Sequence, residues 1–229
     1  MLIGILLTGH APDALRPETG DYDAMFARLL GGHGFEFRHW AVVDGEFPDG
    51  PEAADGWLVT GSRHGAYEDL PWIAQLEALI RAIAAAKRPL VGVCFGHQVI
   101  AQALGGRVEK FAGGWAVGRT EYALADGSTT ALNAWHQDQV VALPDHAHVL
   151  ASNDFCANAA LVYDDAPILT VQAHPEYGAA FIRGLITHRG AAVPETLRTT
   201  AGGGLDDATT DGALWGDRFA AFFKTERIA

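Results

Sequence analysis

The stretch PLVGVCFGHQVIAQALGG, residues 89–106, decides the fold. Its first part, residues 89–93, is a short apolar run that is typical of a buried parallel strand. Between residues 95 and 104 the apolar side chains recur at helical spacing, and the glycine pair at 105–106 ends that helix. The stretch therefore predicts a strand, a sharp turn and a helix.

Cys94 lies at the junction of the strand and the helix. Gly92 stands two residues before it and Gly96 two residues after it, where larger side chains would clash in a tight turn. This spacing predicts a nucleophile elbow with cysteine as the nucleophile, placed where a helix dipole favours the thiolate. The alternative is a structural cysteine, because free cysteine is often a small buried hydrophobic residue.

A second motif follows 80 residues later in the sequence ILTVQAHPEY, residues 168–177. An apolar strand ends there in His174, Pro175 and Glu176. A histidine can take the proton of a thiol and return it to a leaving amine, and a nearby carboxylate can orient the imidazole. His-Pro-Glu alone would indicate a plain turn. Its position at a strand end favours catalysis, because sites in open α/β sheets gather at the carboxyl ends of strands.

Together the two motifs, Gly-Val-Cys94-Phe-Gly-His-Gln98 and His174-Pro-Glu176, resemble those of class I glutamine amidotransferases. The resemblance covers residues 1 to about 188. It implies that Cys94, His174 and Glu176 form a triad that attacks a γ-glutamyl amide and releases an amine or ammonia.

The resemblance also implies an oxyanion hole made by the backbone N–H groups of Gly61 and Phe95. The loop that contains Gly61 reads LVTGSRHG, residues 58–65, where the family more often has a Gly-Gly-Pro version. This variant more closely resembles stand-alone γ-glutamyl peptidase-like members, while the chain is also similar to the glutaminase domain of GMP synthase.

The segment NAWHQDQV, residues 133–140, matches a family loop that lines the glutamine pocket. The resemblance therefore implies that Trp135 and His136 position the substrate and that Asp138 pairs with its α-ammonium group. Gln98, one helical turn after the cysteine, suits a contact to the substrate amide or carboxylate. The alternatives are a polar turn between strands for the segment and an exposed helix position for Gln98.

The order of the expected elements predicts an α/β fold. Strands and helices alternate over the first 105 residues, which indicates a flavodoxin-like, doubly wound, mostly parallel sheet with helices on both faces. Residues 106–165 contain short strand candidates without helices between them, which predicts an antiparallel hairpin extension. We expect a single domain over residues 1–229, with a core up to about residue 188 and a C-terminal part formed by a flexible connection at 194–210 and a helix at 211–224.

Composition limits the function. The formal net charge of −12 argues against a nucleic-acid or anionic membrane partner. Two cysteines imply no disulfide framework, so a reducing cytoplasm is expected, and the short apolar N-terminus predicts a strand rather than a signal peptide. The ten histidines show no metal-binding spacing, and no glycine-rich motif opens a helix, so neither a metal nor a nucleotide cofactor is expected.

Three functions fit these observations. The first is a cysteine hydrolase of glutamine or γ-glutamyl amides that acts alone through a γ-glutamyl thioester. The second is a glutaminase subunit that supplies ammonia to a separate synthase partner. The third is a non-catalytic thiol redox sensor on the same fold, which an intact set of Cys94, His174 and Glu176 disfavours. The sequence favours the first.

Overall fold

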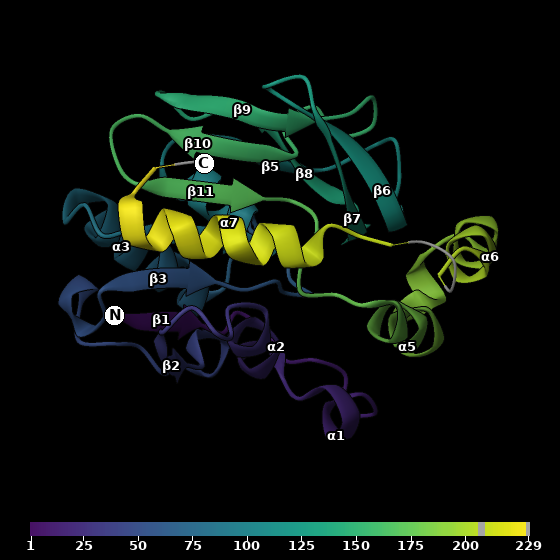
Figure 1. Cartoon of the computed structure of the whole chain (residues 1–229), viewed down its shortest axis with the longest axis horizontal. Coiled ribbons are helices and arrows are strands. Elements are labelled where there is room, and N and C mark those ends of the chain that lie inside the picture. Colours follow the sequence, from purple (N-terminus) through teal and green to yellow (C-terminus); the bar gives the residue numbers. More distant parts are fainter. Residues whose placement is uncertain (206–208, 228–229) are drawn as a thin grey trace.

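The computed structural model describes residues 1–205 and 209–227. Its centre is a nine-stranded sheet with the strand order β2-β1-β3-β4-β11-β10-β9-β6-β7 (Figure 1). The first five strands in this order are mutually parallel. They are β2 (Glu36–Trp40), β1 (Leu2–Leu6), β3 (Gly56–Val59), β4 (Leu90–Val93) and β11 (Ile168–Val171).

The rest of the sheet is antiparallel. It consists of β10 (Ala160–Tyr163), β9 (Ala147–Ser152), β6 (Ala116–Leu124) and β7 (Thr129–His136). A separate antiparallel pair contains β5 (Arg107–Lys110) and β8 (Asp138–Ala142). The predicted fold class, a mostly parallel doubly wound sheet with an antiparallel extension, is confirmed.

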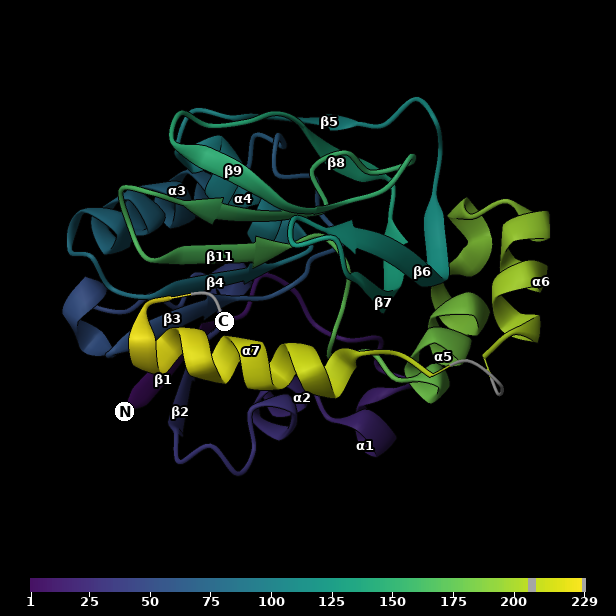
Figure 2. The same ribbon diagram turned by 45° about the horizontal axis from the view of Figure 1, so that its top comes forward.

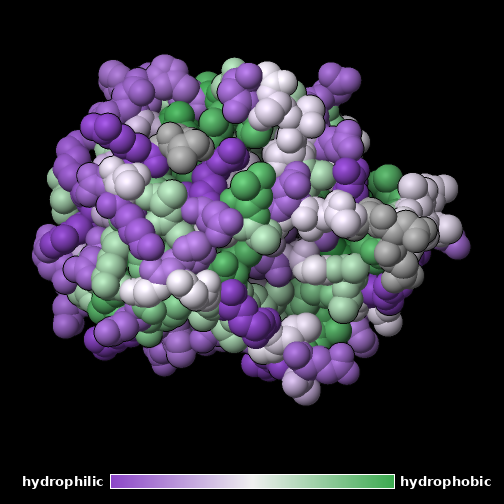
Figure 3. Space-filling model, viewed as in Figure 1, coloured by the Kyte–Doolittle hydropathy of each residue, from purple (hydrophilic) through white to green (hydrophobic). Residues whose placement is uncertain are grey.

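Helices cover both faces of the parallel strands because side chains alternate along each strand. On one face, α3 (Pro71–Ala85) and α4 (Phe95–Ala103) pack on residues such as Val59. On the other, α2 (Tyr22–Leu29) and α7 (Gly212–Thr225) pack on residues such as Leu58. Figure 1 shows α7 in front of the sheet and α3 behind it. On the outer surface of this α7 side, hydrophilic residues predominate, with small hydrophobic groups between them (Figure 3).

The remaining helices lie at one end of the molecule, beyond the carboxyl ends of the parallel strands (Figure 2). They are α1 (Arg16–Thr19), α5 (Ala179–Arg189) and α6 (Glu195–Gly203). A third apolar cluster joins α5 to the end of β1 and to α2 through Phe181, Leu7 and Met25. Short 3₁₀ turns are found at Val42–Asp44, Pro51–Ala53 and Gly190–Ala192. No described helix combines the length and apolar character needed to cross a membrane.

Two expectations about local structure were wrong. The connection expected to be flexible at 194–210 contains α6, which Pro194 precedes and whose glycines stand at its end, where they terminate a helix rather than prevent one. The helix packs on β6 so closely that a Cβ added at Gly118 would lie 2.9 Å from the Ala201 Cβ atom. Residues 206–208 of this connection lie outside the described residues. The expected loop around residues 133–136 is instead the second half of β7.

Candidate active site

Cys94 occupies the predicted elbow between β4 and α4. Its backbone has φ 54° and ψ −104°, a conformation that L-residues rarely adopt and that costs about 1–3 kcal/mol. Both flanking glycines are required by close packing. A Cβ atom at Gly96 would lie 2.2 Å from the Val59 carbonyl oxygen, and one at Gly92 would lie 2.8 Å from the Gly96 carbonyl oxygen. The turn therefore holds the cysteine at the carboxyl end of the sheet.

His174 follows β11, the strand beside β4. Its backbone N–H donates to the Asn133 carbonyl oxygen at 2.8 Å, which ties the loop to β7. The ring Nδ1–H donates to the Glu176 Oε1 atom at 2.8 Å, and the exposed fractions of these two side chains are 2% and 0%. The two residues predicted as base and orienting acceptor thus form a buried pair.

Opposing effects set the protonation of His174. Burial lowers its pKa, but the charges of Glu176 and Cys94 and the hydrogen bonds to both side chains outweigh burial and raise the pKa from 6.5 to about 10. The imidazole is therefore held as an imidazolium between a carboxylate and a thiolate at neutral pH. This is the protonation state from which a histidine can give a proton to a leaving amine.

Tyr177 covers one face of the His174 ring. The two ring centroids are 3.8 Å apart with an angle of 4° between the planes. The Tyr177 carbonyl oxygen accepts a hydrogen bond from the Asn133 side chain at 2.8 Å, and its ring packs on Phe181 and Tyr22. The ring stack fixes the plane of the imidazole and shields that face from water.

Gly61 lies next to both predicted catalytic side chains. A Cβ atom there would be 3.0 Å from the His174 Cε1 atom and 3.7 Å from the Cys94 Cβ atom. The preceding carbonyl, that of Thr60, is held by the Thr8 hydroxyl at 2.9 Å and by the Gly96 N–H at 3.1 Å. Because the peptide is trans, the Gly61 N–H points the opposite way from that carbonyl.

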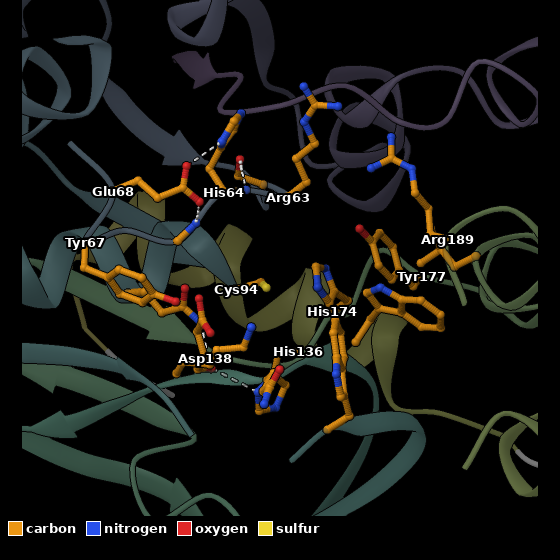
Figure 4. Close-up of a pocket in the computed structure, with 18 of the residues that line it drawn as sticks. Arg63, His64, Tyr67, Glu68, Cys94, His136, Asp138, His174, Tyr177 and Arg189 are labelled. Atoms are coloured by element: carbon orange, nitrogen blue, oxygen red, sulfur yellow. Dashed lines mark hydrogen bonds and ion pairs between the residues drawn. The ribbon is translucent and has the colours of Figure 1, made fainter. Parts of the chain in front are cut away.

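Cys94 and His174 open into a cavity of about 310 Å³, shown in Figure 4. Its lining includes all four residues predicted to bind substrate: Gln98, Trp135, His136 and Asp138. Phe95 lies immediately after Cys94 at the start of α4, where its N–H has no partner within the helix. The structure therefore brings the predicted site residues together around one opening.

A family model for class I glutamine amidotransferases matches residues 51–180, more than half of the chain. The chain belongs to this family. Gamma-glutamyl peptidase 4 from Arabidopsis thaliana is 28% identical over 214 residues, which make up 86% of this chain and 84% of the relative. A glutamine-hydrolysing GMP synthase subunit from Methanopyrus kandleri is 32% identical over 140 residues, 55% of this chain and 68% of that relative.

Solved structures show the same amidotransferase fold. A glutamine amidotransferase from Methylobacillus flagellatus superposes with a TM-score of 0.76 at 22% sequence identity. The match covers 99% of this chain and 92% of that chain. Because nearly the whole chain is matched, α6 and α7 lie within the region that the two structures share.

Three predicted substrate residues of this amidotransferase have partners within the protein. The Gln98 side-chain amide is buried and donates to the Asp138 carbonyl oxygen at 2.9 Å and to the Gln172 side chain at 3.1 Å. His136 is also buried, and burial lowers its pKa to about 4, so its ring is neutral. Burial raises the pKa of Asp138, which a hydrogen bond from Tyr67 and the charge of Lys110 only partly offset.

Several residues that line the cavity were missed by sequence reasoning. They are Tyr22, Arg63, His64, Tyr67, Glu68, Lys110, Trp115, Tyr177 and Arg189. Tyr177 directly follows Glu176, so its neighbourhood was visible, but nothing in the sequence shows that its ring stacks on His174. The others come from loops and element ends that carry no motif, so no local pattern placed them at the site.

The second cysteine lies apart from the cavity. Cys156 is free and buried, and burial raises its pKa to about 12, so it stays a thiol. Within the described ranges, no group of three or more histidine, cysteine or acidic side chains could hold a metal ion.

Proposed function

We propose that this protein hydrolyses glutamine or γ-glutamyl amides through a covalent thioester on Cys94, in the cytoplasm, where its two free cysteines stay reduced. Membership of the amidotransferase family and the similarity to a protein named gamma-glutamyl peptidase support hydrolysis of such C–N bonds. The observation that carries the proposal is the buried His174–Glu176 pair beside a cysteine held in a strained elbow. A structural cysteine would need neither feature.

In the first step, the Cys94 thiolate attacks the δ-carbonyl carbon of the γ-glutamyl group, and the carbonyl oxygen becomes an oxyanion. When the tetrahedral intermediate collapses, the C–N bond breaks and the amine takes a proton from the His174 imidazolium. The products of this step are a γ-glutamyl thioester and a free amine. The pKa of His174, raised to about 10, supports its role as the proton donor at neutral pH.

We assign the oxyanion hole to the backbone N–H groups of Phe95 and Gly61. The neighbouring N–H of α4, that of Gly96, is already used by the Thr60 carbonyl, which leaves the Phe95 N–H at the helix start. The fixed Thr60 carbonyl turns the Gly61 N–H in the opposite direction. In other enzymes one such donor contributes about 3–4 kcal/mol to transition-state stabilisation.

In the second step, water attacks the thioester. His174, now neutral, takes a proton from the water, the C–S bond breaks, and glutamate leaves as the thiolate re-forms. Glu176 keeps the Nδ1–H of the imidazole in place through both steps and stabilises its positive charge. The sum is the conversion of an amide and water into a carboxylic acid and an amine.

The glutamyl group itself would bind on the wall formed by β7 and β8. Asp138 suits the α-ammonium group, and Lys110, its direct partner across the β5–β8 ladder, suits the α-carboxylate. Trp135 and His136 would position the chain between them. Gln98 would act indirectly, because its side-chain amide already holds the Asp138 carbonyl.

A second candidate is a glutaminase subunit that passes ammonia to a synthase in trans. The similarity to the GMP synthase subunit favours it, although that match spans only 55% of this chain. A single experiment separates the two. The purified chain is incubated with glutamine and with substituted γ-glutamyl amides, and free glutamate is measured. Release of glutamate by the chain alone supports the hydrolase, whereas activity on glutamine only after a second polypeptide is added supports the synthase-dependent glutaminase.

A glutamine-like diazoketone tests the nucleophile. It should alkylate Cys94 and spare Cys156, because only Cys94 has a base beside it and opens into the cavity. Peptide mass mapping locates the label. A label on Cys156, or no label at all, contradicts the assignment.

A further inference from the structure

Two arginines border the cavity on the side away from Asp138. Arg63 belongs to the loop after β3, and Arg189 is the last residue of α5. In Figure 4 both lie across the cavity from Asp138, with Cys94 between. Within residues 1–205 and 209–227, neither guanidinium group has a hydrogen bond or an ion pair. In a chain with a formal net charge of −12, two unpaired arginines at one opening indicate an anionic ligand.

The glutamyl group does not account for these charges. Its α-carbon carries one ammonium and one carboxylate, and the facing pair Asp138 and Lys110 provides one partner for each. The glutamyl side of the substrate is thereby neutralised without either arginine. The positive charge of Arg63 and Arg189 is left for the other end of the substrate, the departing amine.

The space beside the arginines fits this division. A second cavity of about 430 Å³ adjoins the first, and Arg63, His64 and Arg189 line both. Its lining also includes two acidic side chains, but Asp13 is paired with Arg16 and Asp44 with His10. An amine larger than ammonia would therefore extend from His174 past two free guanidinium groups into open space.

We propose that the departing amine carries a carboxylate, which Arg63 and Arg189 bind. This inference rests on the proposed hydrolase function. The preferred substrates are then γ-glutamyl amino acids or short γ-glutamyl peptides, while glutamine lacks the anion and γ-glutamyl polyamines present the wrong charge. The guanidinium plane matches a carboxylate through two parallel hydrogen bonds, which gives both affinity and orientation.

The test compares γ-glutamylglycine with γ-glutamylglycinamide, which differ only in the terminal charge. We expect the wild-type protein to prefer the carboxylate by about tenfold or more in kcat/KM, the effect of a charge-assisted pair. Arg63→Gln and Arg189→Gln should each reduce this ratio, and the double variant should bring it to about one. Arg81→Gln removes the same charge from α3, outside both cavities, and should leave the ratio unchanged.

Circular dichroism and the melting temperature show whether each variant folds. A double variant that folds and keeps the wild-type preference overturns the carboxylate site, as does a wild-type protein that hydrolyses both substrates equally. In these cases the proposed hydrolase function still stands. A wild-type protein that hydrolyses neither substrate, nor any other γ-glutamyl amide, contradicts the hydrolase function itself, so the two failures are distinguishable.

Discussion

The two walls of the cavity are built differently. The catalytic wall, formed by Cys94, His174, Glu176 and Tyr177, lies at the ends of parallel strands with its ring and carboxylate groups buried. The recognition wall is formed by Arg63, Tyr67, Lys110, Asp138 and Arg189, which come from loops, edge strands and a helix end. Tyr67, for example, is 46% exposed. Changes in the catalytic wall should therefore alter the rate of the chemical steps, whereas changes in the recognition wall should alter substrate binding and choice.

The largest expected effect comes from the reacting groups. Cys94→Ala and His174→Ala should each abolish turnover, with kcat reduced by at least about 10⁴-fold. Cys156→Ala is the matched control, since it removes the other buried thiol outside the cavity and should keep kcat. Steady-state kinetics on a γ-glutamyl amide measures all three. Residual turnover in a folded Cys94→Ala protein would show that another group is the nucleophile.

Glu176→Gln should have a smaller effect on kcat, because an amide still orients the imidazole but does not stabilise its charge. Loss of the carboxylate lowers the pKa of His174 from about 10, so the alkaline limb of the pH–rate profile should move down by about 1–3 units. An unchanged alkaline limb would mean that another group controls it.

The same pair links folding stability to pH. The folded-state pKa of His174 exceeds its ordinary value of 6.5, so its stabilising effect is complete below about pH 6.5 and is lost as the pH rises through about 10. Chemical denaturation from pH 6 to 10 should show a smaller decrease for Glu176→Gln than for wild type. Equal decreases in both proteins would contradict the link.

Tyr177 should act as a positioning residue of intermediate effect. Tyr177→Phe keeps the ring that stacks on His174 and should keep most of kcat, whereas Tyr177→Leu removes the stack. We expect the leucine variant to lose about tenfold or more in kcat with little change in KM, since misplacement of a catalytic group by 1 Å costs up to about a hundredfold. A pH–rate profile separates this role from simple destabilisation. If phenylalanine and leucine behave alike, the hydroxyl matters and the stack does not.

The contrast between the walls also explains what the sequence predicts. The elbow and the His-Pro-Glu motif are local patterns on consecutive residues, and strand ends of a parallel sheet meet by topology, so Cys94 and His174 could be placed together in advance. Arg63 and Arg189 are separated by 126 positions and carry no motif, and only the packing of α5 against the end of β1 brings them to one opening. Similarly, α6 was missed because its glycines suggested a flexible segment.

Gln98 shows the limit of reasoning from one helix. Its position one turn after Cys94 predicted a side chain aimed at the substrate, and it does line the cavity. The sequence did not show that β8 and β11 supply two acceptors for its amide nitrogen. Those bonds come from strands 40 and 74 residues away, so they depend on tertiary packing that no local pattern encodes.

The smallest effect is expected at Asp138, where one exposed edge meets the substrate. Asp138→Asn removes the charge for the α-ammonium group but keeps the shape, so KM should rise about three- to tenfold while kcat changes little. Burial raises the pKa of the Asp138 carboxyl, so the wild-type KM should rise as the pH falls through that pKa, and the asparagine variant should lack this limb. Glu109→Gln, on the neighbouring β5 strand but outside the cavity, is the matched control. An asparagine variant that loses kcat and keeps KM would move Asp138 from the recognition wall to the chemistry.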